Sequence, residues 1–151
     1  MQNFRLHNLL CVRVASAAVL LVTANVGWAA ENVRPSLIAL TQALNGGDSS
    51  CQMYANFARQ ADRRFPDSKR DNARKATDCV TSARATAEPL YAAALADEPR
   101  AAVKAGIKSM YVKWNAYVDG ISGYEPTDRD AQSAFAEARI SVFLDADLGN
   151  K

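Results

Sequence analysis

The chain has 151 residues, with 18 Lys or Arg against 16 Asp or Glu, so its formal net charge is +2. This near balance gives no electrostatic reason to expect a nucleic-acid partner. Its one histidine, His7, stands close to the start of the chain, which leaves imidazole-dependent catalysis and most zinc, copper and haem sites without a residue to build on.

The first thirty residues have the order of a secretory signal peptide. Arg5 and Arg13 come before an apolar stretch, residues 14–24, and small residues follow it. That stretch is too short to cross a bilayer, because a spanning helix needs about 20 apolar residues. We therefore predict a cleaved signal peptide over residues 1–29 and a single helical domain over residues 30–151. An uncleaved membrane tether and a cytosolic core helix are the alternatives.

Cleavage would change the chemistry of the remaining chain. Its 16 basic and 16 acidic residues would balance, no histidine would remain, and Cys51 and Cys79 would be the remaining cysteines. An even number of cysteines in an exported protein predicts one disulfide, with two free thiols as the alternative. We expect a periplasmic or secreted protein with no stable membrane insertion, no cofactor and no metal.

Apolar residues recur at spacings of three and four, and alanine is abundant, which predicts helices throughout the domain. A short helix over residues 35–45 should begin with Pro35 in its first turn and end at Gly46–Gly47. A second helix should begin at Asp48 or Ser49 and continue to Phe65, because Pro66 follows.

A third helix should begin at Asp67 or Ser68, with a kink or break near residues 85–88 because Pro89 lies inside the pattern. A fourth should follow Asp97. A fifth should start at Thr127, which forms a near capping box with Asp130; its apolar face is expected to include Ile140, Phe143 and Leu144. The economical packing is an all-α antiparallel bundle of four long helices plus one short N-terminal helix, with one disulfide.

Charge is unevenly distributed along the chain. Residues 59–75 hold seven basic and three acidic side chains, whereas residues 119–147 hold two basic and seven acidic ones. The basic segment contains one candidate binding surface, formed by Arg63, Arg64, Lys69 and Arg70. The alternative is structural: the two segments face one another or are simply solvated.

A second candidate surface lies around the end of the fourth predicted helix. It consists of Trp114, Tyr117, Asp119, Tyr124, Glu125 and Asp128. Exposed aromatic residues beside charges suit a protein or glycan partner, whereas core packing is the alternative for the residues at helical spacing. Tyr124 is expected to be exposed in a loop. Whether the acidic loop 119–130 binds calcium is left open, since its spacing is not that of an EF-hand.

The stretch WNAYVDGIS, residues 114–122, is similar to the W-x-x-Y-R-D-x-x-C signature of LprI-type periplasmic helical domains. Trp114, Tyr117 and Asp119 match, whereas Val118 and Ser122 replace the arginine and the cysteine. Some of those domains inhibit lysozyme, so the resemblance implies a binding protein.

Motifs for nucleotide binding, haem attachment and dithiol redox chemistry do not occur in the sequence. We therefore expect a non-enzymatic protein-binding or inhibitor-type protein, with another envelope protein as its partner. The alternatives are an envelope structural or stress protein without a dedicated partner and, more remotely, a hydrolase that uses carboxylates alone. The sequence does not determine the oligomeric state.

Overall fold

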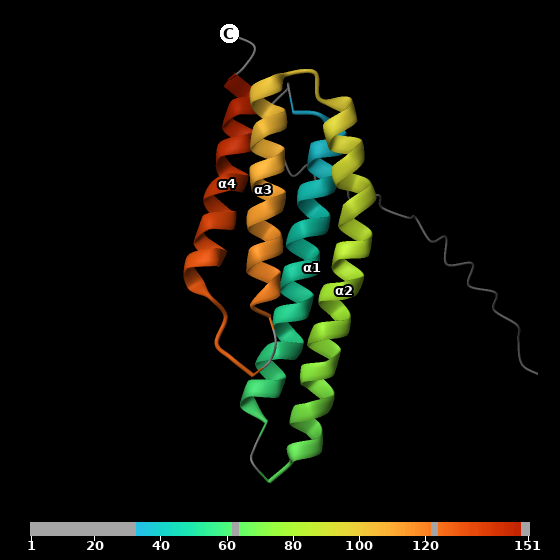
Figure 1. Cartoon of the computed structure of the whole chain (residues 1–151), viewed down its shortest axis with the longest axis vertical. Helices are drawn as coiled ribbons and strands as arrows, with labels where there is room; N and C mark the ends of the chain where they lie inside the picture. Colours follow the sequence, from blue (N-terminus) through green and yellow to red (C-terminus); the bar gives the residue numbers. More distant parts are fainter. Residues whose placement is uncertain (1–32, 62–63, 122–123, 149–151) are drawn as a thin grey trace, which may run out of the picture.

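The computed structural model describes residues 33–61, 64–121 and 124–148. These ranges contain four helices: α1 (Pro35–Gln60), α2 (Pro66–Asp97), α3 (Ala101–Asp119) and α4 (Arg129–Leu148). Successive helices run in opposite directions and lie side by side (Figure 1). The predicted all-α antiparallel bundle is confirmed. The predicted signal peptide, residues 1–29, lies outside the described residues.

The two helices predicted on either side of Gly46–Gly47 are one continuous helix, α1. The helix end predicted there is wrong, because α1 packs closely against α2 at this point and glycine allows that approach. A Cβ added to Gly47 would lie 2.9 Å from the Cβ of Ala83 on α2. The missing side chain therefore lets α1 and α2 approach closely.

Of the kink or break predicted near residues 85–88, the break is wrong, since Pro89 lies within the single helix α2. Pro89 itself is exposed, while Ala87 and Ala94 on either side of it are buried in the core. Packing on both sides of the proline outweighs its local cost. α2 begins at Pro66, a position where the missing N–H would have no helical partner anyway.

The start of α4 differs from the predicted capping box. The Oδ1 atom of Asp128 accepts hydrogen bonds from the backbone N–H groups of Asp130 and Ala131, at 2.9 and 3.2 Å. Asp128 is therefore the N-cap. The hydroxyl of Thr127 instead accepts a hydrogen bond from the Nε2 of Gln52 on α1, and so ties the loop before α4 to that helix.

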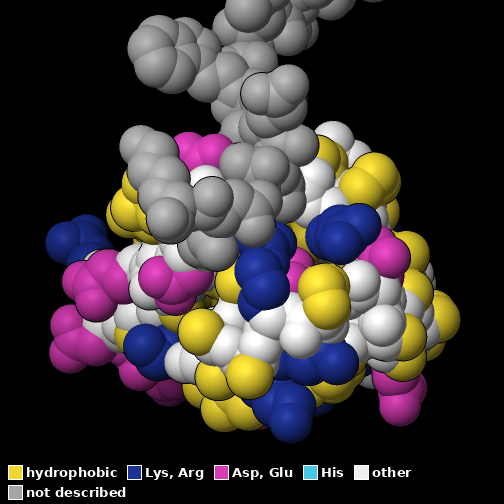
Figure 2. Space-filling model, turned by 90° about the horizontal axis from the view of Figure 1, so that it is seen from above, with side chains coloured by type: hydrophobic (Ala, Val, Ile, Leu, Met, Phe, Trp, Pro, Cys, Tyr) yellow, Lys and Arg dark blue, Asp and Glu magenta, His cyan; other side chains and the backbone are white. Residues whose placement is uncertain are grey.

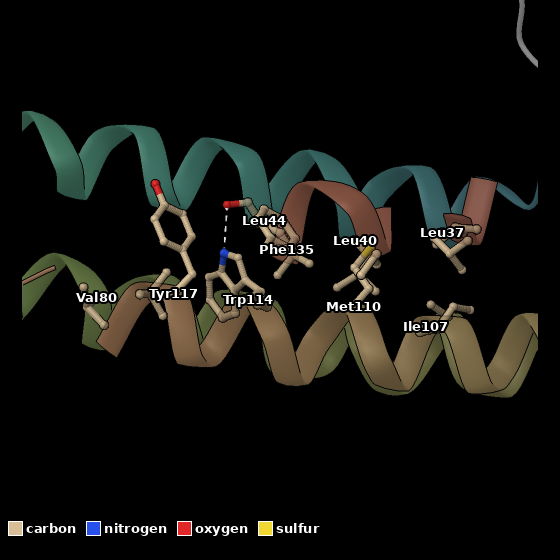
Figure 3. Close-up of a cluster of buried hydrophobic side chains, with 14 of the residues drawn as sticks. Leu37, Leu40, Leu44, Val80, Ile107, Met110, Trp114, Tyr117 and Phe135 are labelled. Carbon is tan, nitrogen blue, oxygen red and sulfur yellow. Dashed lines mark hydrogen bonds between the residues drawn. The ribbon is translucent and has the colours of Figure 1, made fainter. Parts of the chain in front are cut away.

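The core lies between the α1–α2 and α3–α4 hairpins. Leucines spaced three and four apart on α1 face large side chains on α3 (Figure 3). The core residues labelled in Figure 3 are Leu37, Leu40, Leu44, Val80, Ile107, Met110, Trp114, Tyr117 and Phe135. Small residues let the helices within each hairpin approach closely: a Cβ on Gly106 of α3 would lie 2.9 Å from Val142 on α4.

The predicted disulfide is present. Cys51 on α1 and Cys79 on α2 are joined, with their Cα atoms 5.3 Å apart. The bond therefore crosslinks the first helical hairpin near its middle.

A buried ion pair lies at the end of the bundle that contains the α2–α3 connection. Glu98, in the connection between α2 and α3, is 1% exposed and accepts hydrogen bonds from the Nε and Nη2 of Arg100 at 2.6 and 2.8 Å. The Nη1 of Arg100 donates to the backbone carbonyl of Ala146, 2.7 Å away. The pair thus joins the α2–α3 connection to the last turns of α4.

No described helix combines the length and apolar character needed to cross a membrane.

Candidate binding surfaces

Two residues of the aromatic candidate surface belong to the core. The side chains of Trp114 and Tyr117 are 0% and 2% exposed, as the alternative of core packing predicted. The indole Nε1 of Trp114 donates to the backbone carbonyl of Leu44 at 3.1 Å. These two aromatic residues therefore hold α3 against α1 and cannot contact a partner in this structure.

The hydroxyl of Tyr117 lies in a polar cluster between three helices. It accepts hydrogen bonds from the Nε2 atoms of Gln52 on α1 and Gln132 on α4, at 2.8 and 3.4 Å. Burial raises the pKa of Tyr117, and the nearby carboxylate of Asp48 raises it further. Burial also raises the pKa of Asp48, although Ser49 and Arg139 oppose the shift. Because the polar groups pair with one another, the cluster stabilises the bundle.

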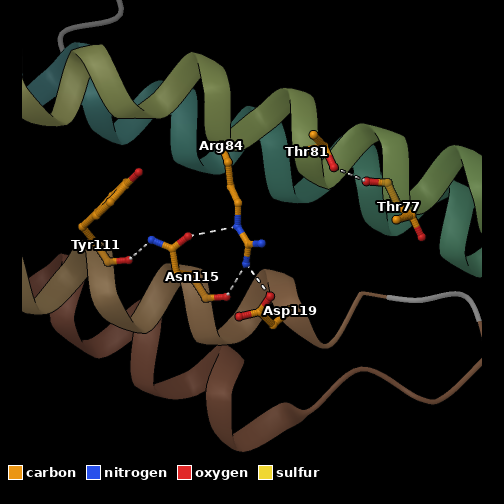
Figure 4. A network of polar contacts seen from close by, with 6 residues as sticks. All are labelled: Thr77, Thr81, Arg84, Tyr111, Asn115 and Asp119. Atoms are coloured by element: carbon orange, nitrogen blue, oxygen red, sulfur yellow. Dashed lines mark hydrogen bonds and ion pairs between the residues drawn. The ribbon is translucent and has the colours of Figure 1, made fainter.

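The side chain of Asp119 also bonds to another residue of the same chain. Its Oδ1 accepts a hydrogen bond from the Nη2 of Arg84 on α2, and the Nε of Arg84 donates to the Oδ1 of Asn115 at 3.1 Å (Figure 4). Asn115 in turn donates to the backbone carbonyl of Tyr111. This network joins α2 to α3 on the bundle's side, so that Asp119 has a structural partner.

The two candidate surfaces predicted from sequence meet at one end of the bundle. The ammonium of Lys69 lies 5.6 Å from the centre of the Tyr124 ring, and the Nη1 of Arg59 donates to the backbone carbonyl of Glu125 at 3.1 Å. Basic residues of the first hairpin thus contact the loop that precedes α4. We call this region the hairpin-end surface; it comprises Arg64, Phe65, Lys69, Tyr124 and Glu125.

Much of the remaining basic segment is paired along α2. Arg70 forms an ion pair with Asp67, while Arg74 and Lys75 both pair with Asp71. Hydrogen bonds from Lys75 and Arg74 lower the pKa of Asp71. These ion pairs lie within the basic segment itself, so they reduce the charge of Arg70, Arg74 and Lys75 without any contact with the acidic segment 119–147. Arg63, also named as a candidate, lies outside the described residues.

Charges of both signs also occur at the end of the bundle opposite the hairpin-end surface. Figure 2 looks onto that end, where Lys and Arg side chains lie among apolar ones and acidic side chains lie on both the left and the right edges of the view. The uneven charge of the sequence therefore does not divide the molecule into a basic end and an acidic end.

Eight large apolar side chains are exposed in the described part of the chain, and their positions distinguish two regions. Four belong to the end of α1, the α1–α2 turn and the loop before α4, three lie on α4, and one stands alone on α3. The first group is Met53, Phe57, Phe65 and Tyr124. The group on α4 is Ile140, Leu144 and Leu148, and the single residue on α3 is Val112.

Two members of the α4 group, Ile140 and Leu144, line a groove between α1 and α4 with a volume of about 440 Å³. Ile140 and Leu144, predicted to widen the buried face of this helix, are 57% and 53% exposed, so that expectation is wrong. The sequence signal for this second row is the spacing of four between Ile140, Leu144 and Leu148. We call this region the α1–α4 groove; its lining residues are Thr41, Asn45, Arg139, Ile140, Phe143, Leu144 and Asp147.

Across the described ranges, no group of three or more His, Cys, Asp or Glu side chains is arranged to hold a metal ion. Within the acidic loop, Asp128 is committed to the N-terminus of α4.

Comparison with protein-family models, with curated proteins and with solved structures finds no match for this chain. The resemblance of residues 114–122 to LprI-type domains is therefore left without support from the rest of the chain. Of the matching residues, Trp114 and Tyr117 are buried in the core and Asp119 forms an ion pair with Arg84, so each has a structural role within this bundle.

Proposed function

We propose that this chain is an exported, non-enzymatic protein that binds another protein of the cell envelope through the hairpin-end surface. The observation that carries the proposal is the contact between Lys69 and Tyr124, which joins two segments distant in sequence into one surface. Phe65 and Tyr124 are 64% and 56% exposed there. Aromatic side chains beside charged groups are enriched at the energetic centres of protein interfaces.

Export is supported by the leader-like composition of residues 1–29 and by the Cys51–Cys79 bond. Disulfides persist mainly in oxidising compartments. Such a crosslink would also keep the first hairpin rigid, which lowers the entropy lost when a partner binds.

A non-enzymatic role is favoured over a carboxylate-dependent hydrolase by the composition of the α1–α4 groove. Asp147 is the one carboxylate among its described lining residues, whereas glycosidase chemistry of this type needs two, held at a fixed separation.

The test is affinity capture from a native envelope extract with the purified protein immobilised. We expect one partner at a stoichiometric ratio, and Tyr124→Ala and Phe65→Ala should each weaken its binding by roughly tenfold or more, as is typical for aromatic anchors. Val112→Ala is the matched control, because Val112 is an exposed apolar residue on α3, outside the surface.

An envelope structural protein would retain no stoichiometric partner in this experiment. A partner that is lost equally from the Val112→Ala protein would contradict the assignment of the surface.

A further inference from the structure

We propose that the α1–α4 groove is a self-association site, in which α4 of a second copy of this chain lies antiparallel to α4 of the first. The inference goes beyond the proposed function and does not depend on the hairpin-end surface. It is carried by the arrangement of charge and apolar side chains along a single helix.

Arg139 and Asp147 line the groove from the same side and are separated by eight residues of α4. At a rise of about 1.5 Å per residue, they lie about 12 Å apart along the helix axis. Phe143 stands midway between them. Residues four apart form ridges on a helix, so Arg139, Phe143 and Asp147 make one ridge with a base at one end and an acid at the other.

The adjacent ridge is apolar and unusually exposed. Ile140, Leu144 and Leu148 are 57%, 53% and 55% exposed. Exposed apolar side chains that are contiguous and bordered by polar groups are typical of interaction surfaces. Covering this ridge would remove apolar area from water and favour association.

The charges determine which occupant fits. In an antiparallel pair with a twofold axis level with Phe143, Arg139 of each chain lies level with Asp147 of the other. A parallel pair would place Arg139 beside Arg139, which is unfavourable. A twofold axis makes any such interface self-complementary. A second copy therefore satisfies both charges at once.

The charges of Arg139 and Asp147 retain capacity for a partner, although Arg139 also attracts the nearby carboxylate of Asp48. Within the described part of the chain, neither Arg139 nor Asp147 forms an ion pair. Arg139 donates one hydrogen bond, from its Nη1 to the Oδ1 of Asn45, and lies over the ring of Phe135. Its guanidinium has five N–H donors, so others can reach a carboxylate.

Sedimentation equilibrium of the purified protein over micromolar to submillimolar concentrations tests the inference. We expect a reversible monomer–dimer equilibrium. Arg139→Glu and Asp147→Arg should each weaken association at least tenfold, because each places like charges together. The double variant Arg139→Glu with Asp147→Arg should restore association to within about threefold of the original protein, because the charges are exchanged but still complementary.

Matched controls separate this pairing from general charge effects. Lys108→Glu on α3 and Asp145→Arg on α4 make the same changes of charge at exposed positions that do not line the groove, and should leave association unchanged. Leu144→Ser should weaken association while lowering the melting temperature of the monomer, measured at a concentration too low for dimers, by only a few degrees, since Leu144 is half exposed. A protein that stays monomeric throughout the concentration range overturns the inference and leaves the groove to a different partner. Single exchanges without effect, or a double exchange without recovery, overturn it equally.

Discussion

The indole nitrogen of Trp114 on α3 donates a hydrogen bond to the backbone carbonyl of Leu44 on α1, 3.1 Å away. This contact joins the two hairpins at the point where α1 passes through Gly46–Gly47. The ring lies in the core beside Tyr111, with the ring centres 5.8 Å apart, and Tyr111 in turn stacks on Tyr91 of α2. Trp114 and Tyr111 together thus connect α3 to both α1 and α2.

Replacing Trp114 with Phe should lower the free energy of unfolding by roughly 2–3 kcal/mol, because it removes a hydrogen bond and leaves a cavity in the core. Urea unfolding followed by far-UV circular dichroism measures the change. The control Val112→Ala, at a side chain that is 66% exposed, should change stability by less than about 0.5 kcal/mol. An equal loss in both proteins would show that the Trp114 contact adds no stability of its own.

The neighbouring glycines of α1 provide a matched pair. Gly46 has no atom within 4 Å of an added Cβ, whereas the same atom on Gly47 would meet Ala83 at 2.9 Å. Gly46→Ala should therefore stabilise the protein by about 0.5–1 kcal/mol through helix propensity. Gly47→Ala should destabilise it, because α1 and α2 would have to separate. Thermal unfolding of the two variants measures these changes in stability. A higher melting temperature in both variants would argue against close packing at Gly47.

Reduction of the Cys51–Cys79 bond should lower the stability of the bundle. The bond links residues 28 apart in sequence, and the chain-entropy model assigns about 3–4 kcal/mol to a loop of that size. For a domain of this length the melting temperature should fall by roughly 10 °C or more. Calorimetry with and without reductant measures the shift, with the Cys51→Ala, Cys79→Ala double variant as the control that should not respond to reductant. Two titratable thiols in the native protein would contradict the disulfide itself.

Acid should weaken the bundle partly through Glu98. Hydrogen bonds from Arg100 hold the pKa of Glu98 below its usual value near 4.5, despite the opposing effect of burial. The unfolded chain therefore binds this proton more tightly than the folded one, and the contribution of the pair, complete above the unfolded pKa, is lost as the pH falls through the folded pKa.

In Glu98→Gln, the free energy of unfolding should depend less steeply on pH below about 4.5 than in the original protein. Chemical unfolding at several pH values between 3 and 6 provides the measurement. Identical slopes for the two proteins would mean that Glu98 titrates alike in the folded and unfolded states.

Periodicity and cysteine count were sufficient to predict the helical class, the antiparallel packing and the Cys51–Cys79 bond. These features follow from apolar side chains at spacings of three and four and from pairing of the two cysteines predicted to remain after signal-peptide removal, both of which are local or countable properties. The sequence also marked Tyr124 as an exposed loop residue, and it is 56% exposed.

Tertiary packing decided the rest. Gly46–Gly47 and Pro89 are local signals for helix ends, yet both lie inside helices because contacts between the helices outweigh propensities of about 1 kcal/mol for glycine and about 3 kcal/mol for proline. Likewise, the spacing of Trp114 and Tyr117 on α3 suits either a surface or a core. An aromatic stripe on a helix shows that this face is covered, but the covering group can be a neighbouring helix or a partner protein, and only the position of α1 opposite α3 shows that Trp114 and Tyr117 are buried within the molecule.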